Sequence, residues 1–146
     1  MKIMAVDFGE ARTGIAISDS MEMLASPVSV IAEKDADVTV EKIVDEALKL
    51  SAKLVVVGLP VNMDGSEGER ARRCREISEK LEARLTVPVR LWDERGSTKT
   101  AIYYMNETDT RGKKRKQTID AAAATVILQN YLDYRKNNPE QQKTTL

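Results

Sequence analysis

The chain has 146 residues, of which 42% are hydrophobic, and it carries 23 basic and 23 acidic residues but no histidine. This length suits one globular domain with a proper core, and the zero net charge argues against a globally basic nucleic-acid binder. It contains no apolar segment of bilayer length, an acid (Asp7) where a signal peptide needs apolarity, and a single cysteine (Cys74), so we expect a cytoplasmic protein without internal disulfides.

The first three predicted elements are strands. Apolar residues from Lys2 to Phe8 predict a strand, and a turn at Gly9 to Arg12 returns the chain into a second strand, Thr13 to Asp19. The third predicted strand runs from Leu24 to Ala32. Because Pro27 lies inside it and cannot donate a ladder hydrogen bond, we expect this strand at a sheet edge.

Helices and strands alternate in the middle of the chain. Asp37 is the predicted N-cap of a helix whose inward-facing residues are Val40, Ile43, Val44, Ala47 and Leu48. The apolar run from Leu54 to Val57 suits a central parallel strand. Asp64 or Ser66 is expected to cap a long helix with its apolar side formed by Ala71, Cys74, Ile77, Leu81 and Leu85.

The last third of the chain predicts a strand from Val87 to Trp92, a short helix from Thr98 to Met105 and a polar, mobile segment from Asn106 to Lys114. A final helix begins near Gln117 and ends near Tyr134, with inward-facing Ile119, Ala122, Ala123, Val126, Ile127, Asn130 and Tyr131. We expect residues 1–136 to form one domain and 137–146 a disordered polar tail. The element order predicts an α/β fold with a mixed sheet and right-handed crossovers.

Acidic residues lie where buried elements end or begin. Asp7 ends the first strand, Asp93 and Glu94 follow Trp92, and Asp120 lies at the start of the last helix. Ligands gather at the carboxyl ends of parallel strands, so we expect Asp7, Glu94 and Asp120 to meet there, whereas Asp93 is interpreted as structural. Since no imidazole is present, these carboxylates indicate divalent metal chemistry, with two Mg²⁺ ions activating water and stabilising the leaving oxygen of a phosphodiester.

Two basic clusters stand out in the neutral chain. The first lies before Asp120 in the predicted loop, where it is expected to follow a nucleic-acid backbone and make binding salt-sensitive; it comprises Arg111, Lys113, Lys114, Arg115 and Lys116. The second is interpreted as a solvated helix face and comprises Arg70, Arg72, Arg73 and Arg75. The few aromatic residues favour recognition of shape and backbone over base stacking.

Four motifs in register resemble the YqgF/RuvX family, whose members are described as Holliday junction resolvases or as nucleases for the 5′ end of the 16S rRNA precursor. The motifs are Asp7 to Ala16, Gly58 to Ser66, Trp92 to Arg95 and Lys113 to Ala123. The resemblance implies the ribonuclease H-like fold, with a five-stranded sheet of order 3-2-1-4-5, an antiparallel second strand and helices on both faces. It also implies Asp7, Glu94 and Asp120 as ligands of Mg²⁺ or Mn²⁺.

Further motif residues are expected to support this site. Arg12 and Arg95 are candidates to bind phosphates. Gly9 and Gly14 suit either a close approach of substrate or a tight hairpin. A helix N-terminus, which favours anions, follows Asn62, Asp64 and Gly65, although capping explains Asp64 equally well.

Three functions stay open from the sequence. We favour a metal-dependent nuclease that processes the 16S rRNA precursor, with a four-way DNA junction as the alternative substrate. A second possibility is a non-catalytic nucleic-acid or ribosome-binding module, which would survive the loss of Asp7. A third is a nucleotide-binding enzyme, since Asp7-Phe8-Gly9 and its hairpin also resemble the first phosphate loop of actin-like ATPases. Junction resolution requires a dimer and trimming only a monomer, so we expect a monomer or weak homodimer with no membrane partner.

Overall fold

The computed structural model describes residues 1–94 and 112–138, without the side chains of residues 112–120. None of the described helices combines enough length and apolarity to cross a bilayer. The described elements are β1 (Ile3–Asp7), β2 (Arg12–Ser18), β3 (Ala25–Ala32), α1 (Ala36–Lys49), β4 (Leu54–Leu59), α2 (Glu69–Arg84), β5 (Val89–Asp93) and α4 (Gly112–Asn137). The predicted short helix from Thr98 to Met105 lies outside the described residues.

The five strands form one sheet in the order β3-β2-β1-β4-β5, which confirms the predicted topology. β1 pairs antiparallel with β2 and parallel with β4, and β4 pairs parallel with β5. Pro27 lies in β3 at the sheet edge, as expected, and the register shifts there because Val28 has no partner between the pairs Ile15–Ser29 and Ala16–Pro27. The carboxyl ends of β1, β4 and β5 therefore point to the same end of the sheet.

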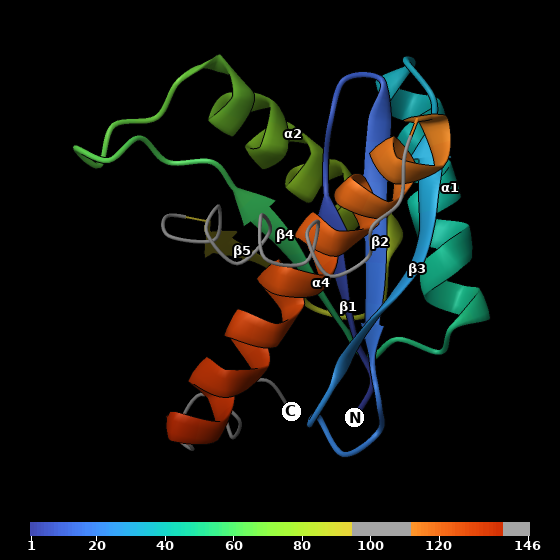
Figure 1. The fold of residues 1–146 in the computed structure, drawn as a ribbon, viewed down its shortest axis with the longest axis vertical. Helices are drawn as coiled ribbons and strands as arrows, with labels where there is room; N and C mark the ends of the chain where they lie inside the picture. The colour runs from blue at the N-terminus through green and yellow to red at the C-terminus, as the bar shows by residue number, and fades with distance from the viewer. Residues whose placement is uncertain (95–111, 139–146) are drawn as a thin grey trace.

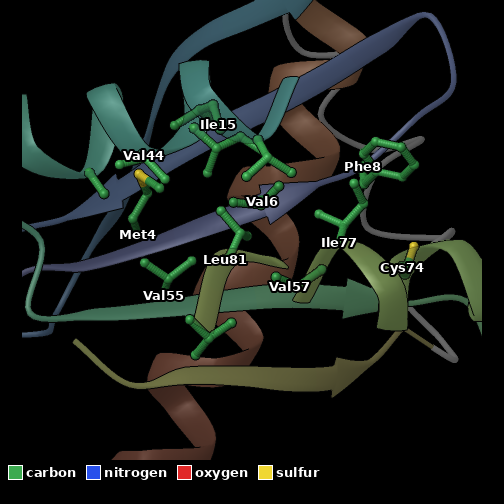
Figure 2. Close-up of a cluster of buried hydrophobic side chains, with 14 of the residues drawn as sticks. Met4, Val6, Phe8, Ile15, Val44, Val55, Val57, Cys74, Ile77 and Leu81 are labelled. Carbon is green, nitrogen blue, oxygen red and sulfur yellow. The ribbon is translucent and has the colours of Figure 1, made fainter. Parts of the chain in front are cut away.

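Strand alternation divides the core into two layers. Met4 and Val6 of β1 pack with residues of α1 and α2, among them Val44, Ile77 and Leu81 (Figure 2). The intervening residues of β1 pack on the other face, where α4 crosses the sheet diagonally (Figure 1). Asp7 continues the series Ile3, Ala5, Asp7, so strand alternation puts it on the α4 face.

The sequence prediction for α1 was wrong at both ends. Asp35 is the N-cap, and its carboxylate accepts a hydrogen bond from the backbone N–H of Val38. Asp37 instead lies in the first turn and forms an ion pair with Lys80 of α2, with 2.7 Å between the oxygen and the nitrogen. Leu48 was predicted to face inward but is 69% exposed, because it lies at the rim of the apolar stripe in the last turn.

The start of α4 also differs from the prediction. The helix begins at Gly112 rather than near Gln117, so the basic residues from Lys113 to Lys116 are helical and not in a loop. At its other end α4 includes Asn137, and the predicted disordered tail stays a prediction because residues 139–146 lie outside the described part. The sequence correctly predicted the burial of four residues of α4 and missed six others, which are Ala121, Ala124, Thr125, Leu128, Leu132 and Arg135. Ala123 and Asn130, also predicted to face inward, are only half-buried.

Three contacts fix the second half of α4 to the sheet. The Trp92 ring of β5 meets the edge of the Tyr131 ring, with 5.4 Å between ring centroids. The Gln129 amide accepts a hydrogen bond from the Ala25 N–H of β3 and donates one to the Met23 carbonyl. The buried Arg135 pairs with Glu22 at 2.8 Å. α4 is therefore attached to both edges of the sheet.

Candidate active site

Asp7 is the last residue of β1 and is half-buried. Its direct partner across the antiparallel pair is Gly14 of β2. On the other side Val6 pairs with Val57 of β4, and continuing that register by one residue brings Gly58 beside Asp7. A glycine therefore flanks Asp7 on each neighbouring strand, so no β-carbon projects from those two positions.

Glu94 turns inward from the end of β5. Its backbone N–H donates to the Leu59 carbonyl of β4 at 3.0 Å, which extends the parallel ladder by one bond. A β-carbon added to Gly58 would lie 3.0 Å from Cδ of Glu94 and 2.7 Å from Cδ1 of Ile127 in α4. The Glu94 side chain therefore lies over β4, between the sheet and α4, on the side toward Asp7.

The electrostatics place both carboxylates near one buried thiol. Burial raises the pKa of Glu94; the positive charge of Arg70 opposes this rise, and the negative charge of Asp93 adds to it. The pKa of Cys74 rises to about 12 through burial and the charge of Glu94, with Arg70 opposing and Asp7 adding. Cys74 lies near the end of β4 (Figure 2), so the charges of Glu94 and Asp7 that influence its thiol are located toward this end of the sheet. Its thiol stays protonated at neutral pH, in line with its expected core role.

Asp120 belongs to α4, but its side chain is not among those described. Its helical position is one turn before Ala124 and two turns before Ile127, both of which are buried against the sheet. Asp7 and Glu94 thus lie at the same end of the sheet, and the role of Asp7, Glu94 and Asp120 as a shared metal site stays a prediction.

The described acids match the ligand preference of a hard cation. Carboxylate oxygens are the side-chain ligands that Mg²⁺ and Mn²⁺ prefer. The half-buried Glu94 lies in a space that only a glycine at position 58 leaves open. Among the described side chains, no three acidic or cysteine residues gather closely enough to hold a metal ion. The donor set therefore fits a divalent cation, with at least one further ligand required.

The β1–β2 hairpin accounts for Gly9 and Arg12. A β-carbon at Gly9 would collide with the carbonyl oxygen of Arg12, so this glycine serves the tight hairpin. Arg12 begins β2 and alternates with Thr13, so it shares the α4 face with Gly14 and with Asp7. Its position is compatible with a phosphate contact beside the carboxylates.

The segment between β4 and α2 forms a turn before the helix begins. The carboxylate of Asp64 accepts hydrogen bonds from the N–H and the hydroxyl of Ser66, at 2.9 and 2.6 Å, and these bonds lower the pKa of Asp64. Gly65 has φ of 90°, and its N–H donates to the Asn62 carbonyl. The N-cap of α2 is Gly68, so the predicted caps were wrong: Asp64 and Ser66 satisfy each other within the turn.

The basic residues divide into three groups. The predictions for Arg95 and Arg111 lie outside the described residues. The run from Lys113 to Lys116 occupies the beginning of α4. Arg70 was interpreted as part of a solvated helix face. No sequence pattern indicated its electrostatic influence on Glu94, because the two residues are 24 positions apart and only the fold brings them near each other.

Comparison with known proteins gives one family and a set of close relatives. Residues 1–134 match the family model "RuvX: Holliday junction resolvase". A Halothermothrix orenii protein named "Putative pre-16S rRNA nuclease" is 43% identical over 135 residues, which are 92% of this chain and 96% of that protein. A Listeria monocytogenes protein of the same name is 42% identical over 135 residues, or 91% and 98% of the two chains.

Solved structures show the same fold at low sequence identity. The structure of Thermus thermophilus RuvC with a Holliday junction substrate has a TM-score of 0.63 and 14% identity, covering 94% of this chain and 97% of that one. The fowlpox virus Holliday junction resolvase has a TM-score of 0.60 and 12% identity, covering 92% and 99%. At such identities the likeness establishes the fold alone, and it confirms the predicted ribonuclease H-like architecture.

Proposed function

Because the chain belongs to the RuvX family, we propose that it is a metal-dependent nuclease that hydrolyses phosphodiesters at the 5′ end of the 16S rRNA precursor. The observation that carries this proposal is the inward turn of Glu94 over Gly58, at the sheet end where Asp7 lies. Relatives about 40% identical over most of the chain bear the name of a nuclease for this RNA, which supports the choice of substrate.

In this proposal Asp7, Glu94 and Asp120 bind Mg²⁺ or Mn²⁺. When bound, such ions activate an attacking water and stabilise the leaving oxygen of a phosphodiester. The chain itself contributes the carboxylates and their fixed geometry: β1 and β5 orient the first two, and the contacts of Tyr131 and Gln129 fix α4 above them. The Glu94 side chain is half-buried, and the lower effective dielectric constant there strengthens its interaction with a cation.

The substrate backbone is bound in this proposal by cations around the carboxylates. They are Arg12, Arg95, Arg111, Lys113, Lys114, Arg115 and Lys116. Gly14 has no side chain that could keep a substrate away from Asp7. The turn containing Asn62, Asp64 and Gly65 borders the same end of the sheet. Backbone contacts of this kind position a nucleic acid without reading its sequence.

We further propose that the protein acts in the cytoplasm as a monomer or weak homodimer. Precursor rRNA is present in that compartment in bacteria, and trimming one end requires a single active site. A second candidate substrate is the four-way DNA junction, which the description of the matching family supports.

The test presents both substrates to the same protein. RNA spanning the 5′ end of the 16S precursor and a four-way DNA junction are incubated with the wild type in Mg²⁺ and in EDTA. We expect cleavage of the RNA in Mg²⁺ only. Cleavage of the junction alone would favour the second candidate. Tight binding of RNA without cleavage in either Mg²⁺ or Mn²⁺ would instead indicate a non-catalytic binding module.

A further inference from the structure

Arg70 lies in the first turn of α2. This N-terminal end of the helix is the one connected to the carboxyl end of β4. The buried side of this helix includes Cys74 and Ile77, which lie one and two turns after Arg70. Arg70 therefore extends the sheet-facing side of α2 beyond the core, toward the strand ends where Glu94 lies over Gly58. Its neighbour Arg72 is turned about 200° around the helix axis and faces solvent.

The arginines of α2 differ in their partners. Arg73 pairs with Glu10 and Glu69, and Arg75 forms two hydrogen bonds with Glu67, at 2.6 and 2.7 Å. Among the described residues, no carboxylate lies within ion-pair distance of Arg70, which is exposed. The guanidinium nevertheless influences both Glu94 and Cys74 electrostatically, which supports its position at the edge of the carboxylate site.

We propose that Arg70 binds a backbone phosphate of the nucleic-acid substrate next to Asp7 and Glu94. A guanidinium matches two phosphate oxygens with paired N–H donors, and the N–H groups of the first helical turn attract the same anion. A cation in the first turn is unfavourable with respect to the helix dipole, and a bound phosphate removes that penalty. This assignment rests on the proposed nuclease function and adds a substrate contact on the α2 side, opposite the basic start of α4.

The test compares Arg70→Ala and Arg70→Lys with Arg72→Ala, which removes the same charge from the same helix on its solvent side. A fluorescent RNA spanning the 5′ end of the 16S precursor is titrated in EDTA at several salt concentrations, with its integrity checked on a gel. We expect Arg70→Ala to bind about tenfold more weakly and to lose close to one unit of salt slope. Arg70→Lys should recover part of the affinity, and Arg72→Ala should bind as the wild type does.

Two further readouts separate the possible failures. Mn²⁺ affinity, measured calorimetrically, should be the same in wild type and Arg70→Ala; a loss of metal affinity with unchanged RNA affinity would show that Arg70 only positions Glu94 and would overturn the proposal. Equal RNA affinity and salt slope in the Arg70 and Arg72 variants would overturn it as well. If the wild type neither binds nor cleaves the RNA, the proposed function itself fails. Matching melting temperatures show that the exposed substitutions leave the fold intact.

Discussion

Gly58 is the residue whose size determines how far Glu94 can turn inward. The position lies in β4, the middle one of the three parallel strands β1, β4 and β5, and its α4 side is filled by Glu94 and Ile127. Any β-carbon there would be in contact with both side chains at once, at 3.0 and 2.7 Å. The carboxylate and a larger residue at position 58 therefore compete for one space.

We expect Gly58→Ala to weaken Mn²⁺ binding about tenfold, because the added methyl group displaces the Glu94 carboxylate from its position. The fold should lose only about 1 kcal/mol, since both close contacts are with the ends of flexible side chains. Calorimetric titration with Mn²⁺ and urea denaturation measure the two effects separately.

Gly68→Ala is the matched control, since a β-carbon at Gly68 meets nothing within 4 Å. It should bind Mn²⁺ as the wild type does, with a small loss of stability because alanine is a poor N-cap. Equal Mn²⁺ affinity in the two glycine variants would show that Glu94 is not a metal ligand.

Glu94 itself should be a destabilising residue in the metal-free protein. Its pKa is raised chiefly by burial, so the ionised form is less stable in the folded than in the unfolded chain. This penalty is complete at pH values above the pKa of Glu94 in the folded chain. It disappears at pH values below 4.5, the ordinary pKa of a glutamate side chain. We expect Glu94→Gln to raise the melting temperature at pH 7 in EDTA and to have no such effect at pH 4.

Added metal should reverse the order of stability of the wild type and Glu94→Gln. Mg²⁺ or Mn²⁺ should stabilise the wild type and leave Glu94→Gln nearly unchanged, because ligands that bind only the folded state raise its stability. Thermal denaturation in EDTA and in Mn²⁺ gives both comparisons. A variant that is less stable than the wild type in EDTA would mean that Glu94 has a structural role instead.

At the scale of elements, the orientation of α4 depends on a buried ion pair at its far end. Arg135 is only 2% exposed and pairs with Glu22 in the β2–β3 connection. Burial alone would raise the pKa of Glu22, but hydrogen bonds from Arg135 and the Met1 amino group lower it. Because the folded pKa is lowered, the stabilisation is complete above about pH 4.5 and is lost as the pH falls through the folded value.

We predict that Glu22→Gln lowers the free energy of unfolding by roughly 2 kcal/mol at pH 7, since it removes a counter-charge from the buried guanidinium of Arg135. The difference from wild type should shrink below pH 4.5. Urea denaturation at pH 7 and pH 4 measures both values. A difference that is independent of pH would contradict the assignment of this stabilisation to the ionised pair.

The beginning of α4 carries cations and no acids in its first turn. Positive charge is unfavourable at that end of a helix, where bound phosphates would compensate it. Replacing Lys113, Lys114 and Arg115 with alanine should weaken RNA binding for every sequence tested and flatten the salt slope by about 2. The melting temperature should stay the same or rise. Equal affinities and salt slopes would show that these side chains only face solvent.

The elements differ in how well their sequences predicted them. Apolar runs and alternation correctly predicted the strands, because a strand that is buried on both faces is apolar throughout and one buried on a single face alternates. Pro27 correctly predicted the edge position of β3. The caps were mispredicted, since Asp35 and Asp37 are equally good N-cap residues and only the tertiary pair with Lys80 decides between them. For α4, charged residues from Lys113 to Lys116 suggested a loop, although helix propensity permits them.

At the scale of the molecule, the two acids converge because β1, β4 and β5 run parallel and so end at the same edge of the sheet. The position of Asp7 at a strand end could be predicted from sequence, because the strand that it ends is clearly apolar and buried. The inward turn of the Glu94 side chain could not be predicted, since it depends on the missing β-carbon of Gly58, which lies in the strand between the two acids. The sheet order brings those three residues to one end, with α2 on one face and α4 on the other (Figure 1).

The proposed function requires Asp7 to belong to a carboxylate centre that cleaves RNA with a divalent metal. The most direct test is single-turnover cleavage of RNA spanning the 5′ end of the 16S precursor, in Mg²⁺, by wild type, Asp7→Asn and Glu10→Gln. Glu10 is the control, since it is a carboxylate of the same hairpin whose partner is Arg73 of α2. We predict that Glu10→Gln cleaves as the wild type does and that Asp7→Asn, while folded, forms no product above the EDTA background. Cleavage by Asp7→Asn at the wild-type rate would show that the protein does not cleave RNA through this carboxylate.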